Sequence, residues 1–178
     1  MRTTCSMIFA MSMAAGASAS IDYSLEDVDV FGTGLTTIGT VETEAAGLQL
    51  ESIDLSGAQL VTYDNTGIPN FADEVILGLE LADSSGASVL YYFFPFPGDD
   101  SWGTFGPLDL TIDLLGEGLY VPASGVLAAF TASIWNDGSG HTAGTWAEGI
   151  MTINLIPAPG AMALLLGATL ASTRRRRV

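Results

Sequence analysis

The chain has 178 residues, of which 20 are acidic and 5 are basic, and its net charge is −15 at neutral pH. The basic residues are Arg2 and the four arginines at positions 174–177, so residues 3–173 contain no lysine or arginine to balance the carboxylates. Such a surface repels nucleic acid and anionic lipid headgroups, because binding to phosphates needs lysine and arginine. We therefore expect no nucleic-acid partner.

The N-terminus predicts a cleaved export signal. Arg2 supplies one positive charge, residues 7–15 are apolar, and Ala17 and Ala19 form a small-x-small pattern that places the cut before Ser20. A retained membrane helix is the competing interpretation, but the apolar stretch has only about half of the ~20 residues that a bilayer requires. We therefore expect signal peptidase to remove the first 19 residues.

The region between the two ends has the period-two alternation of half-buried strands. Residues 107–115, which read PLDLTIDLL, place four apolar side chains on one face and aspartate or threonine on the other, and residues 75–81 behave similarly. Seven more segments have strand character: residues 21–31, 35–41, 48–55, 59–63, 88–94, 126–135 and 145–155. The sequence thus predicts about nine strands.

Turn-forming residues separate these strands. Glycine, asparagine, aspartate and proline gather at residues 64–70, 83–87, 96–103 and 136–141. Helical periodicity occurs only in the terminal segments, and parallel strands would need long crossovers. We therefore expect an all-β fold over residues 20–155, an antiparallel β-sandwich of the jelly-roll-like or Greek-key kind.

The C-terminus has three segments of different chemistry in a fixed order. A proline-rich break is followed by an apolar run, residues 161–173, and then by arginines. The break contains Pro157, Ala158, Pro159 and Gly160, and the arginines are Arg174, Arg175, Arg176 and Arg177. Prolines lack a backbone donor, so we expect them to end the last strand. A short hydrophobic helix of some 14 residues would rise only about 21 Å, a marginal anchor in a ~30 Å hydrocarbon core, with the arginines on the cytoplasmic side.

This tripartite tail resembles the PEP-CTERM sorting signal, which exosortases of Gram-negative bacteria recognise. The resemblance covers residues 156–178 and rests on the two prolines, the leucine-rich apolar run and the arginine cluster. Ala158 stands where the usual motif has glutamate, which gives a Pro-Ala-Pro-Gly variant. The resemblance implies transient membrane anchoring, processing by an exosortase-like enzyme, and delivery to the cell surface or the exopolysaccharide matrix. A plain C-terminal anchor is the alternative, whereas the terminal arginines argue against a GPI signal.

Few catalytic arrangements are available between the ends. His141 is the only histidine, Cys5 is the only cysteine and no lysine occurs. A Ser-His-Asp triad would need His141, but no Gly-x-Ser-x-Gly elbow follows a predicted strand. One histidine cannot build a usual zinc site, and a phosphate-binding loop would lack its lysine. We therefore expect a non-enzymatic protein.

Carboxylates on loops are the remaining candidates for chemistry. Calcium takes six to eight oxygen ligands from such positions, and the candidate ligands here are Asp99, Asp100, Asp27 and Asp29, together with Asn136 and Asp137. None of these segments matches an EF-hand or a nonapeptide repeat. A structural Ca²⁺ is therefore a hypothesis, and no other cofactor is expected.

Aromatic residues lie beside one of these aspartate pairs. Asp99 and Asp100 are close in sequence to Trp102, which is the candidate for stacking on a sugar ring, whereas Trp135 and Trp146 fall within predicted strands. Two carboxylates about 5 to 10 Å apart would also suit glycoside hydrolysis. The simpler interpretation is that this segment is a turn.

Together these features predict an exported bacterial surface or matrix protein with a structural or adhesive role. A calcium-dependent carbohydrate-binding module is the alternative, and a glycan hydrolase is the third possibility.

Overall fold

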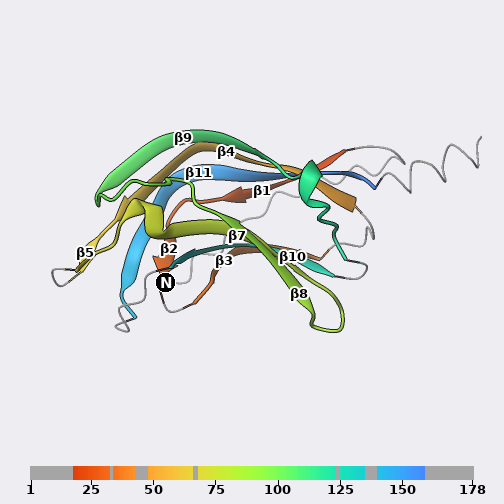
Figure 1. Cartoon of the computed structure of the whole chain (residues 1–178), viewed down its shortest axis with the longest axis horizontal. Coiled ribbons are helices and arrows are strands. Elements are labelled where there is room, and N and C mark those ends of the chain that lie inside the picture. Colours follow the sequence, from red (N-terminus) through yellow and green to blue (C-terminus); the bar gives the residue numbers. More distant parts are fainter. Residues whose placement is uncertain are drawn as a thin grey trace, which may run out of the picture.

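The protein is a sandwich of two antiparallel β-sheets. The computed structural model describes residues 18–32, 34–42, 48–65, 68–122, 125–134 and 140–158. One sheet has the strand order β1 (Ala19–Ser24), β11 (Thr142–Pro157), β4 (Leu48–Thr62) and β9 (Thr104–Asp113), with β2 (Val28–Phe31) also paired to β11. The other has the order β3 (Thr36–Glu42), β10 (Val126–Ser133), β7 (Val75–Ala82) and β8 (Ser88–Phe93). The two sheets form the upper and lower layers in Figure 1, which confirms the all-β class and the antiparallel sandwich.

Three short elements complete the described part of the chain. β5 (Asp64–Asn65) and β6 (Ile68–Pro69) form a small hairpin, and η1 (Ala72–Glu74) follows it as a single 3₁₀ turn. A second 3₁₀ turn, η2 (Leu115–Glu117), follows β9. η1 lies next to the loop of residues 94–103, since the Ala72 N–H donates to the Ser101 carbonyl.

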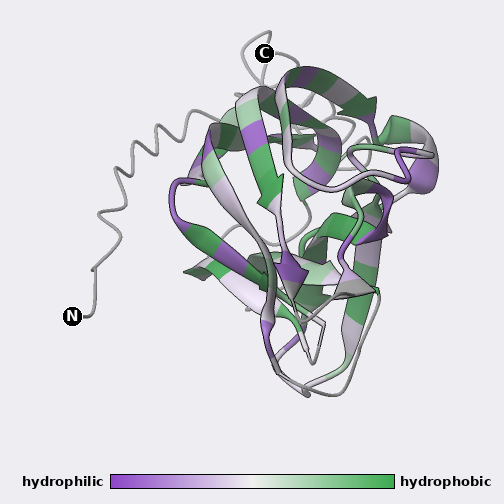
Figure 2. Ribbon diagram, turned by 90° about the vertical axis from the view of Figure 1, so that its left-hand side faces the viewer, coloured by the Kyte–Doolittle hydropathy of each residue, from purple (hydrophilic) through white to green (hydrophobic). Residues whose placement is uncertain are grey.

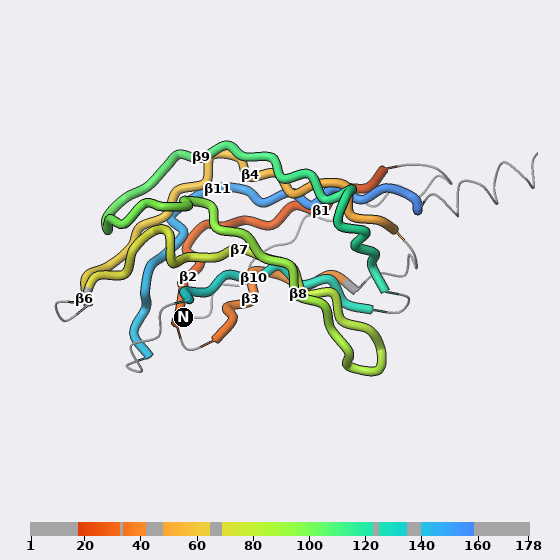
Figure 3. Tube along the Cα trace, in the orientation of Figure 1, coloured from red at the N-terminus to blue at the C-terminus, as the bar shows by residue number. Residues whose placement is uncertain are grey.

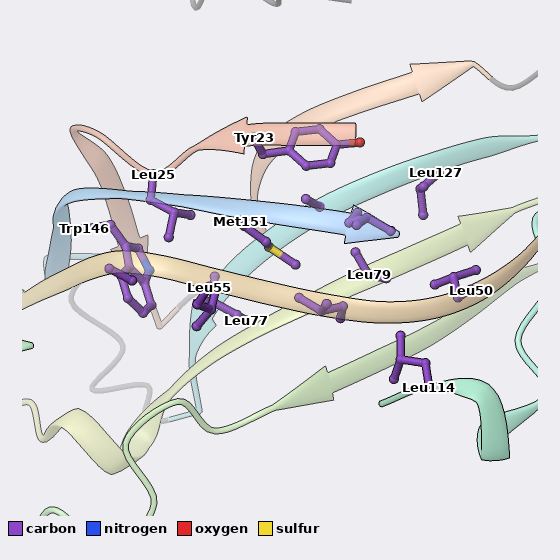
Figure 4. Close-up of a cluster of buried hydrophobic side chains, with 14 of the residues drawn as sticks. Tyr23, Leu25, Leu50, Leu55, Leu77, Leu79, Leu114, Leu127, Trp146 and Met151 are labelled. Atoms are coloured by element: carbon purple, nitrogen blue, oxygen red, sulfur yellow. The ribbon is translucent and has the colours of Figure 1, made fainter. Parts of the chain in front are cut away.

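The main core lies between the two sheets, where strands such as β4, β7 and β11 bury apolar side chains and the edge strands β8 and β9 add half-buried ones. Along β7, Val75, Leu77 and Leu79 are fully buried, as the alternation of its sequence predicts. Figure 2 shows this alternation as hydrophobic and hydrophilic bands along the strands. Figure 4 shows Trp146 and Met151 of β11 within the same cluster of buried side chains as Leu77.

Two strand predictions differ from the structure. Residues 21–31 form two strands, because the chain turns at residues 25–27, where Asp27 adopts a left-handed φ of 57° and Leu25 enters the core. Residues 48–55 and 59–63 are predicted as two strands, but the single long strand β4 covers both segments up to Thr62. Gly57, which lies between the two predicted strands, has a φ of 60°, and the register shifts beside it identify a bulge.

The proline break begins later than predicted. β11 continues through Pro157, which lies opposite Leu48, so the expectation that the strand ends at residue 155 was wrong by two residues. Proline is tolerated at the end of a strand because no further ladder donor is required there. Pro107 likewise lies within β9, which it can do because β9 is an edge strand.

Most of both terminal segments falls outside the described residues. Ala17 and residues 159–178 lie there, whereas Ala19 and Ser20 begin β1 opposite Leu155 and Asn154. No helix in the described ranges is long and apolar enough to cross a membrane.

Candidate functional site

The loop between β8 and β9, residues 94–103, carries Asp99, Asp100 and Trp102 and is held by backbone hydrogen bonds. The Ala72 N–H of η1 donates to the Ser101 carbonyl at 3.1 Å, and the Thr62 N–H of β4 donates to the Gly103 carbonyl at 2.8 Å. The Gly103 N–H in turn donates to Thr62 Oγ1 at 3.1 Å. The loop is therefore fixed at its end against two other segments.

The first half of this loop is a hydrophobic anchor. Pro95 is buried, and the Phe96 ring stacks on the Trp146 ring with centroids 6.3 Å apart. Phe96 also packs against Phe105 of β9, with centroids 5.7 Å apart. The second half of the loop is exposed, and 56% of the Trp102 surface remains accessible. The loop thus runs from the core to a largely exposed segment, residues 98–102, which we call the open tip.

Asp73 of η1 brings a third carboxylate to Asp99 and Asp100. Its Oδ1 atom is buried and accepts no hydrogen bond among the described residues. The pKa of Asp73 is raised, first because burial disfavours the charged form, then because the neighbouring Asp100 and, more weakly, Asp99 are negative. No lysine or arginine between residues 3 and 173 is available to neutralise this group.

Two hydrogen bonds order the carboxylates around this group. Ser101 Oγ donates to Asp99 Oδ1 within the loop. The Phe71 N–H donates to Glu74 Oε2 at 3.0 Å, which caps the start of η1, and burial still raises the pKa of Glu74. Glu74 therefore caps η1, while Asp73 is the carboxyl group whose pKa is raised first by burial and then, most directly, by the neighbouring Asp100.

The predicted calcium ligands do not form one ligand set. Within the described ranges, no three or more histidine, cysteine, aspartate or glutamate side chains are arranged to hold a metal ion. Asp27 occupies the turn between β1 and β2, and Asp29 accepts a hydrogen bond from Thr145 Oγ1 at 2.8 Å. Asn136 and Asp137 lie outside the described residues. Oxygen-rich coordination of Ca²⁺ would therefore need further ligands beyond these pairs.

The other residues that the sequence singled out have different surroundings. Trp146 is fully buried, and its Nε1–H donates to Thr131 Oγ1 at 3.1 Å. His141 is exposed, and Trp135 lies outside the described residues. Trp102 is therefore the tryptophan, among those described, that can contact a ligand from solvent. Sequence reasoning missed Asp73, which no local motif connects with Asp100.

Comparisons with known proteins add a distant structural likeness. No protein-family model matches the chain, and no curated protein matches it. The crystal structure of the infectious bursal disease virus VP2 subviral particle is 14% identical, with a TM-score of 0.38, over 86% of this chain and 37% of that chain. The tomato aspermy virus structure is 13% identical, with a TM-score of 0.29, over 83% of this chain and 80% of that chain. The Desmodium yellow mottle tymovirus structure is 11% identical, with a TM-score of 0.27, over 89% and 97%. This chain spans little more than a third of the first of these proteins, and similarities this distant carry no inference about its function.

Proposed function

We propose that this chain is an exported bacterial protein, sorted by its C-terminal segment to the cell surface or the exopolysaccharide matrix, where the acidic sandwich has a structural or adhesive role. The observation that carries the proposal is the order of the three terminal segments after β11. Pro157 is both the last residue of β11 and the first proline of the break, so no linker separates the last strand from the break. The apolar run and the arginines come next, in the order that a transient anchor requires.

The charge of the sandwich supports a role outside the cytoplasm. All 20 acidic residues fall between positions 22 and 148, and Asp22, Asp109, Asp113 and Glu148 are among those exposed on strands. Self-repulsion keeps such a domain soluble, and salts in the surroundings screen it. A structural or adhesive role needs no catalytic group, which agrees with the single histidine and the lack of cysteine and lysine in residues 20–155.

We infer further that the sandwich is a jelly roll. If β1 and β2 count as one strand and the β5–β6 hairpin is set aside, eight strands remain, four in each sheet. The first and last of these strands are neighbours in one sheet, and β3 and β10 are neighbours in the other. Two interleaved Greek keys produce such an order, and their long-range pairing gives a rigid body suited to a structural role.

A carbohydrate-binding role is the second candidate, and the exposure of Trp102 favours it. An exposed indole beside carboxylates can stack on a sugar ring while the carboxylates accept hydrogen bonds from sugar hydroxyls. Glycan-array binding that is lost in Trp102→Ala but retained in Tyr120→Ala, which removes another exposed aromatic ring, would support this role. An array with no signal in the presence of Ca²⁺ would favour the structural role.

Hydrolysis of a glycan by Asp99 and Asp100 is the third candidate. Its test is whether the protein releases reducing sugar from a polysaccharide and whether Asp100→Asn stops that release.

Cell fractionation followed by mass spectrometry of both ends tests the principal proposal. We expect surface-extracted protein to begin at Ser20 and to end near the proline break. Replacing Arg174, Arg175, Arg176 and Arg177 together by serine should leave export intact but prevent sorting, whereas Arg2→Lys, which keeps the positive charge of the signal, should have no effect. Recovery of surface protein that still carries all four arginines would refute cleavage at the break.

A further inference from the structure

β8 forms an open edge of the second sheet. Its six residues pair with β7 without any register shift, from Ser88 opposite Ala82 to Phe93 opposite Leu77. Among the described strands, only β7 pairs with β8. An open edge presents a row of unpaired N–H and C=O groups that can recruit another strand.

The other edge strands carry features that discourage such pairing. β9 contains Pro107, Asp109 and Asp113, and its register with β4 shifts twice. β3 pairs with β10 through a bulge, and β1 carries the exposed Asp22. β8 has the sequence SVLYYF, with no charge, no proline and no bulge. It is the unprotected edge among the strands that the structure describes.

Apolar side chains are exposed along the same strand. The exposed fractions are 54% for Val89, 50% for Leu90 and 54% for Tyr92, and Phe94 just beyond the strand is 37% exposed. Val89 and Leu90 point to opposite faces of the sheet, so solvent reaches both faces near the start of β8. Figure 3 shows the β7–β8 hairpin extending beyond the rest of the sandwich. An added strand would therefore meet little steric obstruction there.

We propose that β8 pairs antiparallel with the β8 of a second copy of this chain, around a twofold axis. Identical edges are self-complementary in this arrangement, because each strand meets the same donors and acceptors in reverse order. β8 has no charged residue, so no like charges face each other across the new ladder. The proposal deepens the structural role proposed above, but it does not depend on the sorting signal.

The exposed area fits a weak, reversible dimer. Large aromatic side chains bury about 150–250 Å² each, and aliphatic ones somewhat less. Four half-exposed side chains therefore leave about 300–400 Å² open per chain, or about 600–800 Å² for two copies before the backbone is counted. Specific interfaces bury about 1,200 Å² or more, with transient ones below that value.

Charge repulsion predicts how this dimer responds to salt. Each chain carries a net charge of −15, and the carboxylates nearest to β8 in the hairpin are Glu80 on β7 and Asp83 in the turn. The screening length falls from about 30 Å at 0.01 M salt to about 8 Å at 0.15 M. Association through the uncharged β8 edge should therefore strengthen as salt is added, opposite to association through ion pairs.

Sedimentation velocity of the full chain at 10 mM and 300 mM NaCl tests the proposal. We expect a concentration-dependent dimer at the higher salt, with a dissociation constant raised at least tenfold by Leu90→Lys. The matched control is Thr111→Lys, which places the same charge on an exposed position of the edge strand β9 and should leave dimerisation unchanged. Because all variants keep the same termini, any association through the termini is common to them.

The outcomes separate this proposal from sorting. A wild-type chain that stays monomeric at 300 mM NaCl, or a Leu90→Lys chain that dimerises as well as wild type, would overturn it. Equal loss of dimer in Thr111→Lys would overturn it as well, because the effect would then belong to the added charge. If Leu90→Lys lowers the unfolding temperature, Tyr92→Lys repeats the test at the next position on that face. The mass of the termini on surface protein is unaffected by any of these results.

Discussion

Trp146 and Trp102 are the tryptophans that the structure describes, and they have opposite environments. Trp146 is 0% exposed in β11, stacks on Phe96 and donates its indole N–H to Thr131. Trp102 is 56% exposed at the tip of the loop that also carries Asp99 and Asp100. One loop joins the two environments, because Phe96 belongs to its buried half and Trp102 to its open half.

This contrast teaches that residue type alone does not mark a functional site. The sequence already favours Trp102 over Trp146, because Trp146 falls within a predicted strand, and the packing shows Trp146 fully buried and Trp102 exposed. The core side of the loop should control stability, whereas the open side should tolerate change and remain available to a ligand. Substitutions on the two sides of the loop test this division, and those in the core should have the largest effect.

Trp146→Ala is expected to destabilise the fold by about 4 kcal/mol, because it removes a large buried side chain and leaves a cavity against Phe96. Trp102→Ala should change the free energy of unfolding by no more than about 0.5 kcal/mol, as expected of an exposed position. Urea unfolding followed by far-UV circular dichroism measures both variants. Similar losses in the two variants would contradict the division between the core and the open tip.

Gly149→Ala tests the backbone of the core and should lower the free energy of unfolding by about 3 kcal/mol. The positive φ at this position strains any residue that has a side chain, and the added Cβ atom has no space. Gly149 has a φ of 121°, and a Cβ atom there would lie 2.5 Å from Ala58 Cα. Gly116→Ala in η2 is the matched control, since a Cβ there meets nothing within 4 Å. Thermal unfolding of both variants is the measurement, and a Gly149→Ala protein as stable as the Gly116→Ala protein would show that β11 relaxes freely at its register shift around Gly149.

Thr131→Val is expected to lower the free energy of unfolding by about 2 kcal/mol, because two buried polar groups lose their partner. Thr131 Oγ1 accepts the Trp146 Nε1–H at 3.1 Å and donates to the Ile76 carbonyl at 2.8 Å. Thr111→Val makes the same substitution at an exposed position of β9. The Thr111 side chain makes no such buried hydrogen bonds among the described residues. Urea midpoints for the two variants measure the difference, and equal midpoints would mean that the hydrogen bonds contribute nothing to stability.

The sequence predicts the strands better than it predicts how they meet. Alternation locates β7 and β9 because the apolar side chains on one face of each strand pack against the core, which is a local property. The same pattern divides β4 into two strands around Gly57, where the structure has a bulge within one continuous strand. It also places Pro157 outside the ladder, although the end of a strand accepts a proline.

The candidate site shows the same limit. The loop with Asp99, Asp100 and Trp102 is visible in the sequence as a run of turn residues beside aromatic ones. Asp73 lies beside that loop because its neighbour Ala72, in η1, donates a backbone hydrogen bond to the Ser101 carbonyl. No periodicity records a contact between segments so far apart along the chain, so the third carboxylate could be found only in the folded structure.

Asp73→Asn has the smallest expected effect on stability. It tests the carboxylates beside the exposed half of the loop that carries Trp102. The pKa of Asp73 is raised in the folded protein by burial and by Asp100, so the folded state holds this proton more tightly than the unfolded chain does. The stability contributed by the protonated form is present below the ordinary aspartate pKa of about 3.9 and is lost as the pH rises through the folded value. Asp73→Asn should therefore be more stable than wild type at pH 7 by a few tenths of a kcal/mol, since solvent screens a partly exposed carboxylate, and nearly equal to it at pH 3.

Glu148→Gln is the control for this measurement, because it removes one negative charge from an exposed position on β11. General relief of the net charge would stabilise both variants equally, whereas relief of the Asp73–Asp100 repulsion adds to the effect of Asp73→Asn alone. Urea unfolding of the three proteins at pH 3, 5 and 7 separates these contributions. If Asp73→Asn gains no more than Glu148→Gln at pH 7, the charges of Asp73 and Asp100 do not affect stability together, and the exposed half of the loop is a solvated turn.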